Sequence, residues 1–318
     1  MKVLITGGAG FIGSNIVDTL LKDQRVSAVR VLDNLSTGFE RNISEFIHDK
    51  KFEFIKGDIT DYDTCYSATK GINLISHQAA LGSVPRSLKD PLTTNNVNVS
   101  GTLNIFHAAV QNKVKRVVFA ASSSTYGDSE GLPKIEHSIG NPLSPYAVTK
   151  YVNELYASVF ARSYNFQFIG LRYFNIFGPK QDPNGAYAAV IPLFFKTAID
   201  NQSPTINGDG SNSRDFTFVQ NAVNANILSL FTESQKAVNQ IYNIATGQRI
   251  TLNELWSMIK SITSSSSVAN YGPERQGDIP HSLADISKAR TLLNYESPIQ
   301  ANAGLIDSYN WYLKMKTS

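Results

Sequence analysis

The first thirteen residues constrain the fold more than any other segment of this chain. An apolar run from Val3 to Ile5 has the length of a buried strand, and apolar residues recur at helical spacing from Phe11 to Leu21. Between the two runs lies a glycine-rich turn with Gly7, Gly10 and Gly13. This order predicts a site for a dinucleotide, with one glycine for the tight turn, one for close approach of the pyrophosphate and one for helix–strand packing. The N-terminus of the helix would offer its free N–H groups to the phosphates.

A second apolar run ends in an acid and supports this interpretation. Residues 29–32 have the pattern of a strand, and Asp33 follows them, twenty residues after Gly13. A carboxylate at this place accepts hydrogen bonds from the adenosine ribose and repels a 2′-phosphate, so the sequence predicts NAD rather than NADP. A plain strand–turn–helix corner is the alternative, and the acid at this spacing argues against it.

The order of strand and helix patterns predicts the fold class. They alternate to about residue 175, which is typical of an α/β protein with a Rossmann-like, doubly wound parallel sheet. Further strands are expected at 52–56, 71–77, 116–121 and 166–173, and helices at 96–112 and 146–163. After residue 178 the chain is rich in loops that contain Gly, Pro and Asn. We therefore expect a dinucleotide-binding domain at 1–175, to which later segments return, and a smaller mixed α/β substrate domain at 176–318.

Composition argues against several other classes of protein. The net charge of +3 over 318 residues is too small to indicate binding to nucleic acid or to a membrane surface. No apolar stretch approaches the ~18 residues of a membrane span, and the chain opens directly into a strand rather than a targeting signal. Cys65 is the only cysteine, which excludes an internal disulfide and a multi-cysteine metal site. We expect a cytoplasmic protein without a metal.

A serine, a tyrosine and a lysine form the candidate catalytic group. Tyr146 and Lys150 stand four residues apart at the start of a predicted helix and therefore lie on one helical face. A free tyrosine titrates near pH ~10, but a neighbouring ammonium and the N-terminal end of the helix dipole favour the phenolate. Ser122 ends a predicted strand, at the sheet edge where a hydroxyl can relay or orient the proton that the tyrosine removes. Taken singly, these features are commoner as a solvated helix face and a hydroxyl-rich turn, but together they fit a Ser–Tyr–Lys arrangement.

An ordered series of motifs then supports a family resemblance over nearly the whole chain. The motifs are TGGAGFIG at 6–13, DNLSTG at 33–38, GDI at 57–59, HQAA at 77–80, SPYAVTK at 144–150, LRYFNIFGP at 171–179, RDFTFV at 214–219 and RQGDIPHSLADISKA at 275–289. The chain resembles the extended short-chain dehydrogenase/reductases, and among them the nucleotide-sugar 4-epimerases related to UDP-glucose 4-epimerase. AASSSTYGD and HSLADISKA are similar to the subgroup that acts on UDP-N-acetylglucosamine and UDP-N-acetylgalactosamine.

The resemblance implies which residues bind NAD and which bind a UDP-sugar. Those on the cofactor are Gly7, Gly10, Phe11, Ile12, Gly13, Asp33, Asn34, Ser36, Gly38, Asp58, Ile59, Gln78, Ala79, Ala80, Tyr146, Lys150 and Tyr173. Those on the substrate are Ser83, Ser122, Ser124, Tyr146, Asn175, Ala189, Val190, Arg214, Arg275, Asp278 and Ser282. Among the latter, two arginines match ligands of the diphosphate, which a guanidinium can bind through paired hydrogen bonds.

The resemblance also implies the reaction. It is a reversible 4-epimerisation of UDP-N-acetylglucosamine and UDP-N-acetylgalactosamine through a 4-keto sugar, with the hydride held transiently on bound NAD. Related dehydratases usually carry Thr-Asp-Glu, and decarboxylases Glu, where this chain has Ser122-Ser123-Ser124. Because this segment has no second acid or base, we expect the reaction to end with the return of the hydride to the 4-keto sugar.

Two alternatives to this function stay open at this stage. One is the same reaction on UDP-glucose or on UDP-N-acetylglucosaminuronic acid, whose carboxylate would need an added cation or several hydroxyls that the sequence does not place. The other is a non-catalytic dinucleotide sensor, although such proteins commonly lose the Tyr-x-x-x-Lys pair. The resemblance further implies a homodimer through a four-helix bundle formed by helices 96–112 and 146–163.

Overall fold

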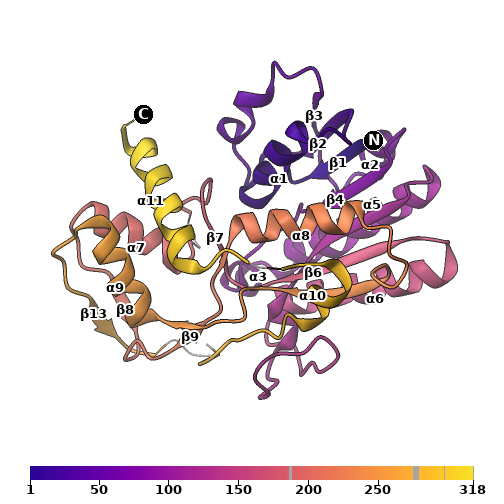
Figure 1. Cartoon of the computed structure of the whole chain (residues 1–318). Helices are drawn as coiled ribbons and strands as arrows, with labels where there is room; N and C mark the ends of the chain where they lie inside the picture. Colours follow the sequence, from indigo (N-terminus) through magenta and orange to yellow (C-terminus); the bar gives the residue numbers. More distant parts are fainter. Residues whose placement is uncertain (186–187, 275–278, 297, 318) are drawn as a thin grey trace.

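The computed structural model describes residues 1–185, 188–274, 279–296 and 298–317. Seven parallel strands form the central sheet in the order β3-β2-β1-β4-β5-β6-β11 (Figure 1). The strands are β1 (Lys2–Thr6), β2 (Ala28–Asp33), β3 (Phe52–Lys56), β4 (Leu74–His77), β5 (Arg116–Ser122), β6 (Phe168–Tyr173) and β11 (Gln240–Ile244). This sheet confirms the Rossmann-like, doubly wound fold.

The sheet is buried on both faces, and its sequence explains why. In β1, Val3 and Ile5 pack into one hydrophobic cluster, whereas Leu4 packs into the other, because successive side chains of a strand point to opposite faces. A parallel strand between two helix layers therefore has a continuous apolar sequence.

Two layers of helices cover the sheet. On one face lie α1 (Phe11–Lys22), α8 (Val219–Phe231) and α10 (Ser287–Leu293). On the other lie α2 (Tyr62–Thr69), α5 (Gly101–Gln111) and α6 (Pro145–Ser163). The short helices α3 (Val84–Lys89) and α4 (Pro91–Asn95) follow β4 and lead into a π-helical turn at Asn96–Ser100. The predicted helix 96–112 therefore begins with this wider turn, and the predicted strand 71–77 is shorter.

A smaller helical unit lies beside the carboxyl end of the sheet, at the left of Figure 1. Its helices α7 (Val190–Ile199), α9 (Leu252–Thr263) and α11 (Ala301–Thr317) pack on one another through aromatic contacts such as Phe194–Trp256. Short strand pairs of the described residues lie outside the central sheet. They are β7 (Ile176–Phe177) with β10 (Thr217–Phe218), β8 (Thr205–Asn207) with β13 (Asn270–Gly272), and β9 (Ser213–Arg214) with β12 (Ile250–Thr251). None of the helices in the described ranges is long and apolar enough to cross a bilayer.

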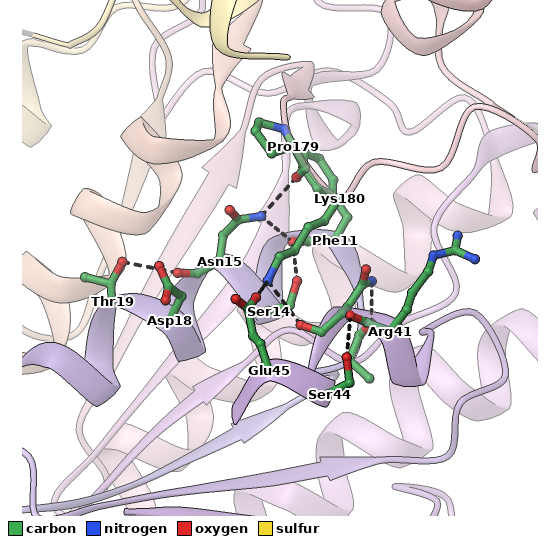
Figure 2. Close-up of polar contacts among 12 residues, drawn as sticks. Phe11, Ser14, Asn15, Asp18, Thr19, Arg41, Ser44, Glu45, Pro179 and Lys180 are labelled. Atoms are coloured by element: carbon green, nitrogen blue, oxygen red, sulfur yellow. Dashed lines mark hydrogen bonds and ion pairs between the residues drawn. The ribbon is translucent and has the colours of Figure 1, made fainter. Parts of the chain in front are cut away.

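The chain leaving β7 is fastened to the start of α1 (Figure 2). The Asn15 side chain donates to the carbonyls of Phe11 at 2.9 Å and Pro179 at 3.1 Å. The Lys180 ammonium pairs with Glu45 at 2.8 Å and donates to the Asn42 carbonyl at 3.1 Å. We call this group of contacts the Lys180 clasp, and it joins α1 and the segment after β2 to the segment that leads into the helical unit.

Candidate active site

A cavity of about 510 Å3 lies where the central strands end, and we call it the glycine cavity. Every residue that the resemblance assigns to NAD belongs to its lining. The lining as a whole comes from the loops after β1, β2, β3 and β4, from the ends of β5 and β6, and from the first two turns of α1 and α6. The fold thus gathers these residues at one sheet edge, while their individual roles stay predictions.

The glycine turn has the shape that a dinucleotide requires. Gly7 has a φ of +70°, and a Cβ there would lie 2.7 Å from the Ala79 nitrogen. A Cβ on Gly13 would lie 2.1 Å from the Gly7 oxygen, so only glycine lets the helix pack this close to the turn. A Cβ on Gly10 would have only the Gly7 oxygen near it, at 3.1 Å, so the space beside this glycine is otherwise open.

The polar groups around the turn fit NAD as well. Helix α1 begins after Gly10 without a side-chain cap or an acidic residue in its first turn, so its N–H groups are available to phosphates. Asp33 accepts hydrogen bonds from the N–H groups of Ala9 at 2.9 Å and Leu35 at 2.8 Å. Burial raises the pKa of Asp33, and these two hydrogen bonds oppose the rise. Each carboxylate oxygen keeps a further lone pair for a ribose hydroxyl.

The three candidate catalytic residues meet at the far end of this cavity. Ser144 caps α6 by accepting from the Ala147 N–H at 3.1 Å, and Pro145 occupies the first helical position, which places Tyr146 in the first turn. Ser122 ends β5, and its Oγ accepts from the Ser124 hydroxyl at 2.8 Å. One helical turn after Tyr146, Lys150 lines the same cavity.

Burial controls the ionisation of this group. Burial raises the pKa of Tyr146, while a hydrogen bond with Ser122 works against the rise. The Lys150 ammonium donates to the Ala120 carbonyl at 2.8 Å and lies 5.9 Å from the centroid of the Tyr146 ring. Burial lowers the pKa of Lys150 to about 8. The net shift of the Tyr146 pKa is therefore upward, because burial disfavours the charged form of the side chain, and the lowering of this pKa by Lys150 stays a prediction.

The predicted substrate residues are divided between two adjoining cavities. A cavity of about 250 Å3, the lobe cavity, is lined by Asn175, Ala189, Val190 and Arg214 among others. A cavity of about 390 Å3, the serine cavity, has Ser122, Ser124, Asn175, Arg214 and Ser282 in its lining. Asn175 lines all three cavities, and Ser122 lines both the glycine cavity and the serine cavity.

Three of the predicted residues are not placed in these walls. Ser83 caps α3 by accepting from the Arg86 N–H at 3.2 Å, and the described linings include its neighbour Val84 but not Ser83 itself. Arg275 and Asp278 lie outside the described residues.

Sequence reasoning missed Asn98, which supports the site from behind. Its Oδ1 accepts from the Leu81 N–H at 2.7 Å, and its Nδ2 donates to the Leu81 carbonyl and to Thr149, each at 3.1 Å. It thus joins the loop after β4 to the residue before Lys150. Asn98 lies in the π-helical turn, and such turns occur frequently at functional sites. The signal in the sequence was the asparagine-rich segment 95–98, since Asn is a poor helix former.

Asn226 and Lys134 were also missed. Asn226 in α8 donates to the Tyr173 hydroxyl at 2.7 Å, and this hydroxyl donates to the Gln78 side chain at 3.1 Å. Helix α8 thus orients two residues of the glycine cavity. Lys134 lies in the wall of the serine cavity. Neither belongs to a local motif, and both reach the site through the tertiary fold.

The comparisons with known proteins agree with this geometry. The model of the family described as "NAD dependent epimerase/dehydratase family" matches residues 3–245. UDP-glucose 4-epimerase of Mycolicibacterium smegmatis is 34% identical over 98% of both chains. A solved UDP-N-acetylglucosamine 4-epimerase of Methanobrevibacter ruminantium, in complex with UDP-N-acetylmuramic acid, has a TM-score of 0.92 and 39% identity over 99% of this chain and 98% of that one.

A further solved structure contains the dinucleotide. UDP-glucose 4-epimerase of Thermus thermophilus, in complex with NAD, has a TM-score of 0.88 and 33% identity over 98% of this chain and 99% of that one. The family match covers most of the chain, and the relatives match it from end to end. The chain belongs to the NAD-dependent epimerase/dehydratase family.

Proposed function

We propose that the chain is a UDP-sugar 4-epimerase that interconverts UDP-N-acetylglucosamine and UDP-N-acetylgalactosamine. One observation carries this proposal: Ser122 lies in the walls of both the glycine cavity and the serine cavity, beside Tyr146. A sugar in the serine cavity would therefore have its reacting carbon next to the proposed base and next to the dinucleotide site.

The proposed chemistry assigns one task to each residue. Bound NAD supplies the acceptor, and later the donor, of the hydride at sugar C4. Tyr146, as the phenolate, takes the proton of the 4-hydroxyl, and Ser122 orients that hydroxyl through its own hydrogen bonds. Lys150 places a positive charge behind the tyrosine. Tyr146 returns the proton when the 4-keto sugar is reduced on its other face.

Turning the sugar over requires that the rest of the substrate stays bound. Arg214 belongs to the walls of both the lobe cavity and the serine cavity, so it lies where a diphosphate would link a nucleoside to a hexose. Its guanidinium is oriented by donation to the carbonyls of Ser213 at 3.0 Å and Pro280 at 3.1 Å. We assign the nucleoside to the lobe cavity and the hexose to the serine cavity.

The lining of the serine cavity favours epimerisation over the other reactions of the family. The described lining has hydroxyls of Ser122, Ser123 and Ser124 after β5 and no Asp or Glu. Loss of water from the sugar needs a second acid and base, which this part of the chain does not place there.

The first prediction tests the proposed reaction itself. Purified protein, incubated without added NAD, is expected to interconvert the two N-acetylated UDP-sugars, because the hydride returns to the same molecule. Denatured protein is expected to release dinucleotide, which chromatography quantifies, and NMR identifies the sugar product. A dehydrated or decarboxylated product would overturn the proposal.

A second prediction concerns the N-acetyl group and Ser282. The segment that carries Ser282 is anchored to β9, because the Ser282 N–H donates to the Ser213 carbonyl at 3.0 Å and His281 forms a β-bridge with Ser213. Ser282→Tyr would fill the space that we assign to the acetamide, and overpacking costs about 1–3 kcal/mol. The ratio of kcat/KM for UDP-N-acetylglucosamine to that for UDP-glucose is expected to fall about tenfold to a hundredfold. Ser282→Ala, which adds no bulk, serves as the control, and equal losses on both substrates in the tyrosine variant would contradict the assignment.

The homodimer stays a prediction. Val148, Leu155 and Val159 form an exposed apolar face on α6, as expected for a helix that packs on a second copy. Sedimentation of the protein in solution checks it, and a monomeric mass would exclude it.

A further inference from the structure

The serine cavity has an unusual charge for a site that binds a neutral hexose. Its described lining contains two basic side chains that carry charge at neutral pH, Lys134 and Arg214, and no carboxylate. Arg214 also lines the lobe cavity, where a diphosphate would reach it, but Lys134 does not. One cation of the sugar site is therefore left without an assigned anion.

The Lys134 side chain is buried without a charged partner. The residue is 5% exposed, and its ammonium donates to the backbone carbonyl of Ser129. No carboxylate among the described residues lies within ion-pair distance of it. Burial lowers the pKa of Lys134, and no acidic group opposes this. An ammonium has three N–H donors, and a single carbonyl does not neutralise its charge.

The fold holds Lys134 in this position through its backbone. Its N–H donates to the Leu283 carbonyl at 2.7 Å, and its carbonyl accepts from the Asp285 N–H at 3.0 Å and from the Asn243 side chain at 2.9 Å. These contacts set Lys134 beside the segment that carries Ser282. The backbone of Lys134 is thus anchored to two other segments of the chain.

A buried cation without a partner is costly, and proteins keep such charges where a ligand neutralises them. Hydroxyls of a neutral hexose can accept hydrogen bonds from an ammonium, but they leave its charge uncompensated. A carboxylate on the hexose would both accept these hydrogen bonds and neutralise the charge.

We propose that Lys134 binds a carboxylate carried by the hexose, so that the site takes N-acetylated UDP-hexuronic acids in preference to the neutral sugars. This inference rests on the proposed 4-epimerase function and specifies its substrate class. Ser122, Ser123 and Ser124 would complete the subsite as hydroxyl donors on the same wall.

The experiment compares two substrates of nearly equal size that differ in charge, UDP-N-acetylglucosamine and UDP-N-acetylglucosaminuronic acid. The measured quantity is kcat/KM for 4-epimerisation of each substrate. Because the substrates differ only in the carboxylate, the ratio of the two values reports the effect of this group. In the wild type, kcat/KM is expected to be higher for the acid than for the neutral sugar. Lys134→Met keeps an unbranched side chain of similar length and removes the charge. In this variant the ratio of kcat/KM for the acid to kcat/KM for the neutral sugar is expected to fall about tenfold to a hundredfold.

Two further variants serve as controls. Lys134→Arg keeps the charge and is expected to retain most of the preference. Lys288→Met removes another half-buried lysine, which packs on the Tyr242 ring outside the described cavity linings, and is expected to leave the ratio unchanged.

The outcomes separate this inference from the function on which it rests. An equal ratio in the wild type and in Lys134→Met would overturn the inference and leave the epimerase intact. A wild-type kcat/KM that is not higher for the acid than for the neutral sugar would overturn it as well, whether or not Lys134→Met folds. A wild type that epimerises neither substrate would refute the proposed function.

Discussion

Replacement of Tyr146 by phenylalanine is expected to reduce kcat for 4-epimerisation by about 10²- to 10⁴-fold, the usual cost of losing a general base. The ring would remain in the wall of the glycine cavity, because the cavity loses one hydroxyl and nothing else. Protein stability and dinucleotide content are therefore expected to stay near those of the wild type. Steady-state turnover, measured together with dinucleotide released on denaturation, checks both statements.

Two other variants make this result specific. Ser122→Ala is expected to lose less activity than Tyr146→Phe, since the serine orients the proton and does not accept it. Tyr151→Phe removes a hydroxyl from the same helix outside the described cavity linings, and it is expected to keep full activity. Near-wild-type turnover in Tyr146→Phe would assign the base to another group.

The second large effect is expected at the glycine turn. Gly13→Ala places a Cβ where the Gly7 oxygen lies 2.1 Å away, which is far inside van der Waals contact. Either the turn or the start of α1 must move, and both belong to the wall of the glycine cavity to which we assign the pyrophosphate. Overpacking of this severity costs at least about 3 kcal/mol, so dinucleotide affinity is expected to fall roughly a hundredfold or more.

The measurement is the amount of NAD that remains bound after gel filtration, compared with Gly131→Ala. A Cβ on Gly131 would have no neighbour within 4 Å, so this control carries the same chemical change without the clash. Full retention of NAD in Gly13→Ala would show that binding of the dinucleotide does not depend on the shape of this turn.

Much of the fold could be predicted from the sequence because its signals are local. The strand predicted at 52–56 has the same bounds in the structure, while the strand predicted at 116–121 ends one residue later and that at 166–173 begins two residues later. The π-helical turn before Gly101 was not predicted, because apolar spacing over one turn does not separate it from an α-helix. Strand β11 was not predicted either, because its five residues stand in a loop-rich part of the sequence and join the sheet only through pairing with β6.

The same distinction separates the predicted and missed parts of the site. The glycine turn, Asp33 and the Tyr146–Lys150 pair depend on spacing within short segments. Lys134 reaches its position through contacts with residues 283 and 285, far away in the sequence, so no local pattern shows it. The raised pKa of Tyr146 likewise depends on how deeply the folded protein buries it.

The Lys180 clasp has a consequence for how the protein is assembled during translation. Asn15 and Pro179 are 164 positions apart, and Glu45 and Lys180 are 135 apart, so the N-terminal partners emerge from the ribosome long before the others exist. Contacts between such distant positions are slow to form and close late. A fragment that stops at residue 175 would have every glycine of the turn and none of the later partners of the clasp. The helix that follows the glycine turn is thus synthesised first, and the clasp that holds it can form only after more than half of the chain has been synthesised.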